Sequence, residues 1–158
     1  MILKLFPFGA ALLIGTGCAQ AEPADPDNSN AFLAAGFHLE DGQWHKCDDP
    51  GTVSYSSGSF QDVGDLNGDG LPEAVITEGS AYCYGNTGTA FSLVSSDANG
   101  WTLIIESVGI PVFLDTVSAD GWPDIEIGGP GFCFPLMRWD GSAYRQIGNQ
   151  YEGEVCNP

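Results

Sequence analysis

Oxygen-bearing side chains alternate along the stretch Asp65-Leu66-Asn67-Gly68-Asp69-Gly70-Leu71-Pro72-Glu73. Three carboxylates and one amide this close together can surround a hard cation, and Ca²⁺ takes about six to eight oxygen ligands in flexible geometry. Gly70 allows the sharp turn that a residue with a Cβ resists. The sequence therefore predicts a calcium site, the alternative being a metal-free turn, since Asp, Asn and Gly favour turns by themselves. The predicted ligands are the side chains of Asp65, Asn67, Asp69 and Glu73 and the carbonyl of Leu71.

The best-known loop of this composition, the EF-hand, does not fit this stretch. An EF-hand needs a glutamate at the twelfth position and a helix on each side of the loop. The twelfth position here is Ile76, and the segment Glu73–Thr77 has the composition of a strand behind a proline. The loop is therefore expected to join two strands.

The stretch resembles the calcium-binding loop of FG-GAP and VCBS-type repeats, which occur in integrin α-chain propellers and in many bacterial surface proteins. The family pattern Asp-x-Asn-x-Asp-Gly-x-Pro-Asp is matched from Asp65 onward except at its last place, where this chain has Glu73. The resemblance covers roughly residues 60–147. It implies a calcium-stabilised β-repeat module that acts in adhesion or in other binding.

An internal repeat surrounds the loop. The segment Asp65–Cys83 aligns with Thr116–Cys133, and each ends in a cysteine between two aromatic residues. The second loop keeps fewer carboxylates than the first, and affinity in such loops follows the number of charged ligands. It is therefore expected to bind metal weakly or not at all. Its ligands in register would be Thr116, Ser118, Asp120, the carbonyl of Trp122, and Asp124.

The turn-forming residues in the rest of the chain indicate an all-β fold. The chain has 22 Gly and 10 Pro, and the pairs Asp41-Gly42, Asn99-Gly100 and Asp140-Gly141 each precede an aromatic residue, as in tight hairpins. The expected unit is hairpin, link, acidic loop, strand, turn and strand, repeated over about 60–110 and 111–158 in one domain, 37–158. A closed propeller needs about four or more blades. We therefore expect antiparallel, blade-like units forming a small sandwich, or else a partial propeller.

Cysteine usage points to an oxidising compartment. Apart from Cys18, four cysteines remain, and an even number in an acidic single-domain chain indicates two disulfides. Four cysteines allow three pairings, and the repeat favours the pairing in which each bond joins the late turn of one unit to its neighbouring segment. The favoured bonds are Cys47–Cys83 and Cys133–Cys156. They would staple a core that is small for its length.

The N-terminal segment has the features of an export signal. Leu3–Ile14 is apolar but too short to span a bilayer, as in a signal-peptide core. Residues 1–21 would be released at Ala19-Gln20-Ala21, or residues 1–17 at a lipobox-like sequence that leaves a lipid on Cys18. Residues 22–36 are expected to be a tether with a short helical turn near Asn30–Ala35. The protein is thus expected to be periplasmic, envelope-anchored or secreted, with membrane contact only through Cys18.

Charge and side-chain chemistry restrict the function further. The formal net charge of −17 disfavours binding to nucleic acid and to anionic lipid. The partner is expected to be a protein or a glycan, and the four tryptophans are either a carbohydrate platform or core residues. Arg138 is expected to stack on an aromatic face beside Trp139.

Two alternatives to a binding module remain open. One is a small envelope hydrolase with a carboxylate pair, Asp48 or Asp49 with Glu78; the other is a structural envelope protein. Two carboxyls with raised pKa values in a deep cleft would favour the hydrolase.

Overall fold

The computed structural model describes residues 26–157. The expected signal segment, its cleavage sites and the lipidation of Cys18 lie outside the described residues. Within residues 26–157, no helix is both long enough and apolar enough to cross a membrane. The fold is all-β and antiparallel, as predicted, apart from one N-terminal helix and one short helical segment between strands.

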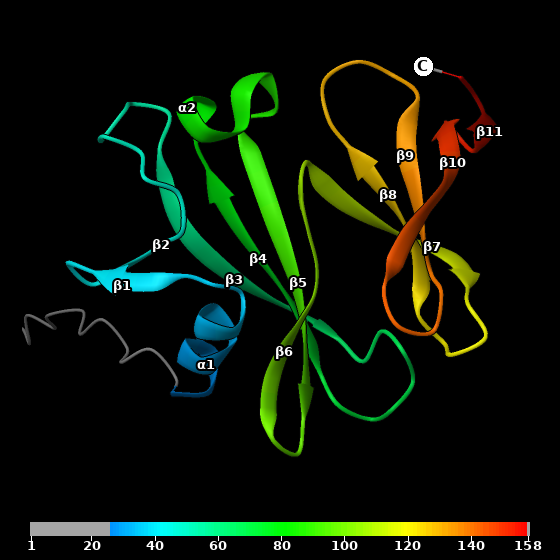
Figure 1. Ribbon diagram of the computed structural model, residues 1–158, viewed down its shortest axis with the longest axis horizontal. Coiled ribbons are helices and arrows are strands. Elements are labelled where there is room, and N and C mark those ends of the chain that lie inside the picture. Colours follow the sequence, from blue (N-terminus) through cyan, green and yellow to red (C-terminus); the bar gives the residue numbers. More distant parts are fainter. Residues whose placement is uncertain (1–25, 158) are drawn as a thin grey trace, which may run out of the picture.

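The chain forms three successive layers (Figure 1). The first holds a helix and a two-stranded hairpin, the second a four-stranded sheet, and the third a five-stranded sheet. The first layer contains α1 (Pro26–Ala34), β1 (His38–Glu40) and β2 (Gln43–His45). The second contains β3 (Ser56–Gly64), β4 (Glu73–Gly79), β5 (Thr89–Asp97) and β6 (Gly100–Val108), with α2 (Ala81–Tyr84) and a 3₁₀ turn (Gly85–Thr87) between β4 and β5. The third contains β7 (Ile110–Val117), β8 (Pro123–Gly128), β9 (Phe134–Trp139), β10 (Tyr144–Tyr151) and β11 (Glu154–Val155).

The two sheets repeat one topology. In each, consecutive strands pair in the order β3-β4-β5-β6 or β7-β8-β9-β10. The acidic loops join the first strand to the second, and the Asx-Gly hairpins join the third to the fourth, with Asp97 facing Gly100 and Trp139 facing Tyr144. The β1–β2 hairpin precedes the first acidic loop, and in each sheet a further Asx-Gly hairpin follows the acidic loop.

The middle sheet buries both of its faces. Alternate residues of a strand point to opposite faces, so Ala74 and Ile76 pack against α1. Val75 belongs to a second cluster that also contains Ile125 and Ile127 of the third layer. The two sheets therefore form a sandwich whose shared core is apolar, and the first layer covers the opposite face of the middle sheet.

Helix α1 begins earlier than the sequence suggested. A helical turn was expected near Asn30, whereas the helix begins at Pro26, a residue that fits the first helical position because it lacks an amide hydrogen. Phe32 is buried and stacks on Trp44 at 4.7 Å between ring centroids. Residues 26–34 are thus part of the packed first layer and not of a tether.

Two disulfides form within the described residues, as predicted, and they have the favoured pairing. Cys47 bonds to Cys83 and Cys133 bonds to Cys156. The first bond ties the segment after β2 to α2, and the second ties the turn before β9 to the segment after β11. Neither bond crosses between the two sheets, so the shared apolar cluster holds the sheets together.

Candidate metal centre

The loop between β3 and β4 is folded around the side chain of Asp65. Its Oδ1 accepts hydrogen bonds from the amides of Gly68 (2.7 Å) and Asp69 (3.1 Å), and its Oδ2 accepts one from the amide of Gly70 (2.8 Å). Three convergent amides thus bend the loop back onto its first residue. Gly70 has φ +87°, a conformation that glycine adopts without strain.

Two further side chains continue this arrangement. Asn67 Oδ1 accepts from the amide of Asp69 at 2.9 Å, and Asp69 Oδ1 accepts from the amide of Leu71 at 2.8 Å. Asp69 Oδ2 accepts from Asn67 Nδ2 at 3.1 Å. Each of these oxygens uses one hydrogen bond, and a carboxylate or amide oxygen has about two lone pairs. Each therefore retains acceptor capacity for a cation.

Glu73 lies beneath the loop at the start of β4 and is fully buried. One carboxylate oxygen accepts from the amide of Leu66 at 2.7 Å, and the other from the hydroxyl of Ser95 at 2.7 Å. Burial raises the pKa of Glu73 above its ordinary value; the two hydrogen bonds act in the opposite direction, and the charges of Asp69 and Asp65 raise it further. The fold therefore holds this carboxyl in an environment that disfavours its charge.

No basic side chain of residues 26–157 compensates the three carboxylates of this loop. The described residues contain one lysine and two arginines, and each forms an ion pair elsewhere. Lys46 pairs with Glu106, Arg138 with Asp124, and Arg145 with Asp140. The loop thus carries a formal charge of −3 without a protein counter-charge, in a chain that is already strongly acidic.

The second loop, between β7 and β8, treats its carboxylate differently. Asp124 is almost completely buried and accepts two hydrogen bonds from Arg138, at 2.8 Å from Nε and 2.6 Å from Nη2. The hydroxyl of Thr116 donates a third at 2.7 Å. The Arg138 guanidinium holds the pKa of Asp124 below its ordinary value; burial opposes this, and Thr116 adds to it. Arg138 therefore pairs with a carboxylate, and the aromatic stacking expected of it is not its main interaction.

Glu73 and Asp124 occupy equivalent places in the two sheets. Glu73 faces Ser95 in the β4–β5 ladder. Ile125 faces Met137 in the β8–β9 ladder, so Asp124, one residue earlier, lies opposite Arg138. Where the first sheet has a neutral hydroxyl, the second has a guanidinium.

Two other expected ligands of the second loop, Thr116 and the carbonyl of Trp122, are also engaged. The carbonyl of Trp122 accepts from the amide of Ser118 at 2.8 Å, and Thr116 contacts Asp124 as described. The hydroxyl of Ser118 is buried and has no hydrogen-bond partner in the described part of the chain. The structure thus brings Thr116, Asp124 and Arg138 together as a closed polar group, an arrangement that leaves little ligand capacity for a metal.

The two loops contact each other. Gly121 of the second loop has φ +84°, and a Cβ at this position would lie 2.1 Å from the carbonyl oxygen of Asn67 in the first loop. Only glycine permits this approach. The position of Asn67, one of the predicted ligands, therefore depends on the second loop.

The oxygen-rich composition of the first loop suits Ca²⁺ better than Zn²⁺, which prefers nitrogen and sulfur ligands. Among residues 26–157, no three His, Cys, Asp or Glu side chains converge to hold a metal by themselves. A cation at this loop would therefore also use the oxygens of Asn67 and Leu71 beside those of Asp65 and Asp69. Glu73, whose oxygens contact Leu66 and Ser95, would complete the charge.

Asp49, one of the carboxylates considered for a hydrolase, does not have the raised pKa that this role would favour. Asp49 accepts hydrogen bonds from Ser80 (2.5 Å), Thr52 (2.6 Å) and Gly51 (2.9 Å). Burial raises the pKa of Asp49, but these hydrogen bonds outweigh it, and the net pKa lies below the ordinary value. Asp49 is thus a turn-stabilising carboxylate and not an acid with a raised pKa.

The tryptophans do not form one platform. Trp44 and Trp101 pack against the cluster on the α1 side of the middle sheet, whereas Trp122 and Trp139 belong to the cluster between the sheets. The aromatic residues therefore serve the two cores.

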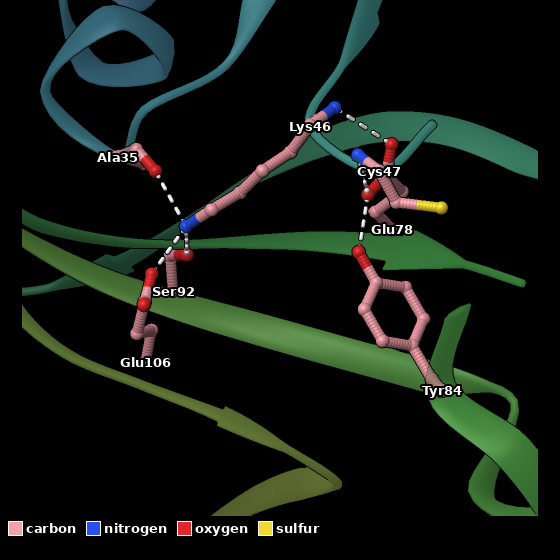
Figure 2. Close-up of polar contacts among 7 residues, drawn as sticks. All are labelled: Ala35, Lys46, Cys47, Glu78, Tyr84, Ser92 and Glu106. Carbon is pink, nitrogen blue, oxygen red and sulfur yellow. Dashed lines mark hydrogen bonds and ion pairs between the residues drawn. The ribbon is translucent and has the colours of Figure 1, made fainter. Parts of the chain in front are cut away.

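Sequence reasoning missed the surroundings of Glu78. The structure places its carboxylate beside the backbone amides of Lys46 and Cys47 and the hydroxyl of Tyr84, and the Lys46 side chain extends from there to Glu106 (Figure 2). These residues come from four separate elements or connections, and no spacing along the chain joins them.

Comparison with known proteins identifies no relative, since no family model, no curated protein and no solved structure matches the chain significantly.

Proposed function

We propose that the protein is an exported β-repeat module that binds Ca²⁺ at the loop Asp65–Glu73 and acts in binding or adhesion at the cell envelope. The observation that supports this proposal most is the uncompensated charge of the loop. Asp65, Asp69 and the buried Glu73 have no basic partner among the described residues, whereas the equivalent Asp124 has Arg138.

The bound ion would act mainly on stability. Removing the repulsion among three carboxylates favours the folded loop, and an ion that binds only the folded state stabilises it by about 2.7 kcal/mol at a hundredfold excess over its Kd. Mg²⁺ would stabilise less, because it demands octahedral geometry and gives up water reluctantly. The resemblance of the loop to FG-GAP and VCBS-type repeats supports Ca²⁺ as the ion.

Thermal unfolding tests the calcium site. The oxidised protein is melted in chelator, in millimolar Ca²⁺ and in millimolar Mg²⁺, and the midpoint is expected to rise most in Ca²⁺. Asp69→Ala is expected to remove most of the rise, and Asp120→Ala, the equivalent change in the second loop, is the matched control that retains it. Equal midpoints in chelator and in Ca²⁺ for the unsubstituted protein would mean that the loop is only a turn.

Export and the partner need separate experiments. Intact mass of the native protein is expected to give an N-terminus at Glu22 or a lipidated Cys18, and retention of Met1 in the cytoplasm contradicts export. For the partner, the protein is used as bait in envelope extract with and without chelator. A protein or glycan that is retained only in Ca²⁺ supports calcium-dependent binding, and retention that is indifferent to chelator separates the binding role from the ion.

A further inference from the structure

A small pocket lies on the side of the middle sheet that faces the first layer. Its volume is about 200 Å³, smaller than the roughly 300 Å³ or more of pockets for drug-sized ligands. Phe37 and Val108 form part of its apolar wall, and Lys46, Tyr84 and Glu106 are among its polar residues. It is formed by different residues from those of the acidic loop and is a separate candidate site.

Glu78 fixes the polar end of this pocket. Its side chain is buried and accepts hydrogen bonds from the amides of Lys46 (2.9 Å) and Cys47 (3.1 Å) and from the hydroxyl of Tyr55 (2.9 Å). The hydroxyl of Tyr84 donates a fourth. A carboxylate has about four lone-pair positions, so Glu78 has none left for a ligand. Its effect is to orient Tyr84, whose proton is directed to Glu78 and whose oxygen can still accept.

Lys46 is equally saturated. Its ammonium group donates to the carbonyl of Ala35 at 2.7 Å, to Ser92 Oγ at 3.5 Å and to Glu106 (Figure 2). An ammonium group has three donors, and all three are used. Lys46 therefore has no donor with which to bind an anion, which the net charge of the chain would in any case repel.

Glu106 is the acceptor that remains. One of its oxygens contacts Lys46, and the other has no hydrogen-bond partner within residues 26–157. Its side chain is 54% exposed, so a ligand can reach it. The pocket thus presents the Glu106 carboxylate and the Tyr84 oxygen as acceptors, with two carboxylates against one ammonium. The Lys46 ammonium already lies over the Phe37 ring, at 5.6 Å from its centroid, so Phe37 offers a ligand apolar surface.

We propose that this pocket binds a small organic ammonium ion with a compact apolar group. The ammonium donates to Glu106 and to the oxygen of Tyr84, and the apolar group lies against Phe37 and Val108. The small volume limits the ligand to about one ring or a short chain.

Titration with matched probes tests the proposal. Benzylamine, benzyl alcohol and benzoate share one ring and differ in charge, and binding to the full oxidised protein is followed by amide chemical-shift changes. Benzylamine is expected to shift the amides around Phe37 and Val108 and to bind at least about tenfold more tightly than benzyl alcohol, the factor that one charge-assisted hydrogen bond supplies. Equal binding of the two, or shifts confined to the acidic loop, overturns the proposal.

Three variants locate the site. Glu106→Gln is expected to weaken benzylamine binding about tenfold, and Glu154→Gln, an exposed glutamate of β11, is the control that leaves it unchanged. Because Glu106→Gln also removes the partner of Lys46, a second variant, Val108→Trp, fills the mouth of the pocket and leaves the charges intact. It is expected to abolish binding, and full binding by a folded Val108→Trp protein contradicts the proposal.

Discussion

The two sheets place a buried carboxylate at the same point and neutralise it by different means. In the second sheet, Asp124 receives a bidentate contact from Arg138. In the first, Glu73 receives only the hydroxyl of Ser95 and the amide of Leu66. The pKa values move in opposite directions, raised for Glu73 and lowered for Asp124. The Arg138 side chain is a permanent cation beside Asp124 in the second sheet, whereas no basic side chain among the described residues pairs with Glu73 in the first.

This difference explains why two similar loops are expected to respond differently to calcium. The Arg138 guanidinium neutralises Asp124 before any ion binds, which leaves one carboxylate, Asp120, among the expected ligands of the second loop against three in the first. The first loop has three like charges, and their repulsion falls only when a mobile cation binds or a proton is taken up. Counting carboxylates in each loop gives part of this result; the residue on the neighbouring strand decides the rest.

The largest effect is expected for Arg138→Ser, which gives the second sheet the same pair as the first. Asp124 would be left buried and charged without its partner; because the Arg138 side chain is 46% exposed, the loss is expected to lie somewhat below the roughly 3 kcal/mol of a fully buried pair. Arg145→Ser is the matched control, because Arg145 pairs with the partly exposed Asp140 and exposed pairs contribute about 1 kcal/mol or less. Urea unfolding in chelator measures both. Equal losses for the two variants contradict the special role of Arg138.

A somewhat smaller effect is expected for Gly121→Ala, which tests the contact between the loops. The new Cβ would displace the carbonyl of Asn67 and would be held at a positive φ, a combined cost of about 2 kcal/mol. Gly153→Ala meets nothing within 4 Å at nearly the same φ, and about 1 kcal/mol is expected from backbone strain alone. Gly121→Ala is also expected to weaken the response to Ca²⁺; a normal response would show that Asn67 is not a ligand.

Neutralising the two equivalent carboxylates is expected to change stability in opposite directions. In chelator, Glu73→Gln removes a buried charge that has no counter-charge, and a gain of about 1 kcal/mol is expected, together with loss of the Ca²⁺ response. Asp124→Asn breaks the pair with Arg138, and a loss of about 1 kcal/mol or more is expected. Unfolding curves of both variants in chelator provide the comparison. Losses in both would indicate that Glu73 is already compensated without an ion.

The pH dependence is expected to show the same opposition with the smallest effect. The pKa of Asp124 lies below its ordinary 3.8 in the fold, so its pair contributes stability above pH 3.8 that is lost as pH falls through the lower folded-state pKa. The pKa of Glu73 lies above its ordinary 4.5, so in chelator its protonation adds stability as pH falls toward 4.5. Thermal melts in chelator at a series of acidic pH values measure both effects. The loss of stability at low pH is expected to be absent in Asp124→Asn, and the gain of stability toward pH 4.5 is expected to be absent in Glu73→Gln.

The sequence predicts the elements whose information is local. The Asx-Gly pairs indicate hairpins: Asp41-Gly42 is the two-residue turn between Glu40 and Gln43, and the other two pairs lie at the hairpins closed by Asp97–Gly100 and Trp139–Tyr144. The strand after the acidic loop follows from Pro72 and the apolar run behind it. The repeat places Cys83 and Cys133 after the equivalent strands β4 and β8, and each bonds to a segment that neighbours its own unit, at Cys47 and Cys156.

The partner of Asp124 required information that the sequence does not contain locally. Arg138 reaches it only because β8 and β9 pair in a particular register, and Trp139 suggested a different contact for the same residue. The pocket at Glu78 is harder still to predict, since Lys46, Tyr84 and Glu106 converge from the segment after β2, from α2 and from β6. The start of α1 was misplaced because a proline-rich composition resembles a tether until tertiary packing buries Phe32.

The connectivity of the disulfides determines the order in which they can form while the chain is synthesised from its N-terminus. Cys47 and Cys83 close a segment of 36 residues that ends before the third layer begins, so the first layer and the start of the middle sheet can be locked while the rest is still being made. Cys133 must wait for Cys156, 23 residues later. The two closures do not interleave, and neither oxidation step depends on undoing the other. Until the second sheet arrives, however, the newly made middle sheet exposes Val75, Phe91 and Leu93, and this interval is when the nascent protein is most exposed to aggregation.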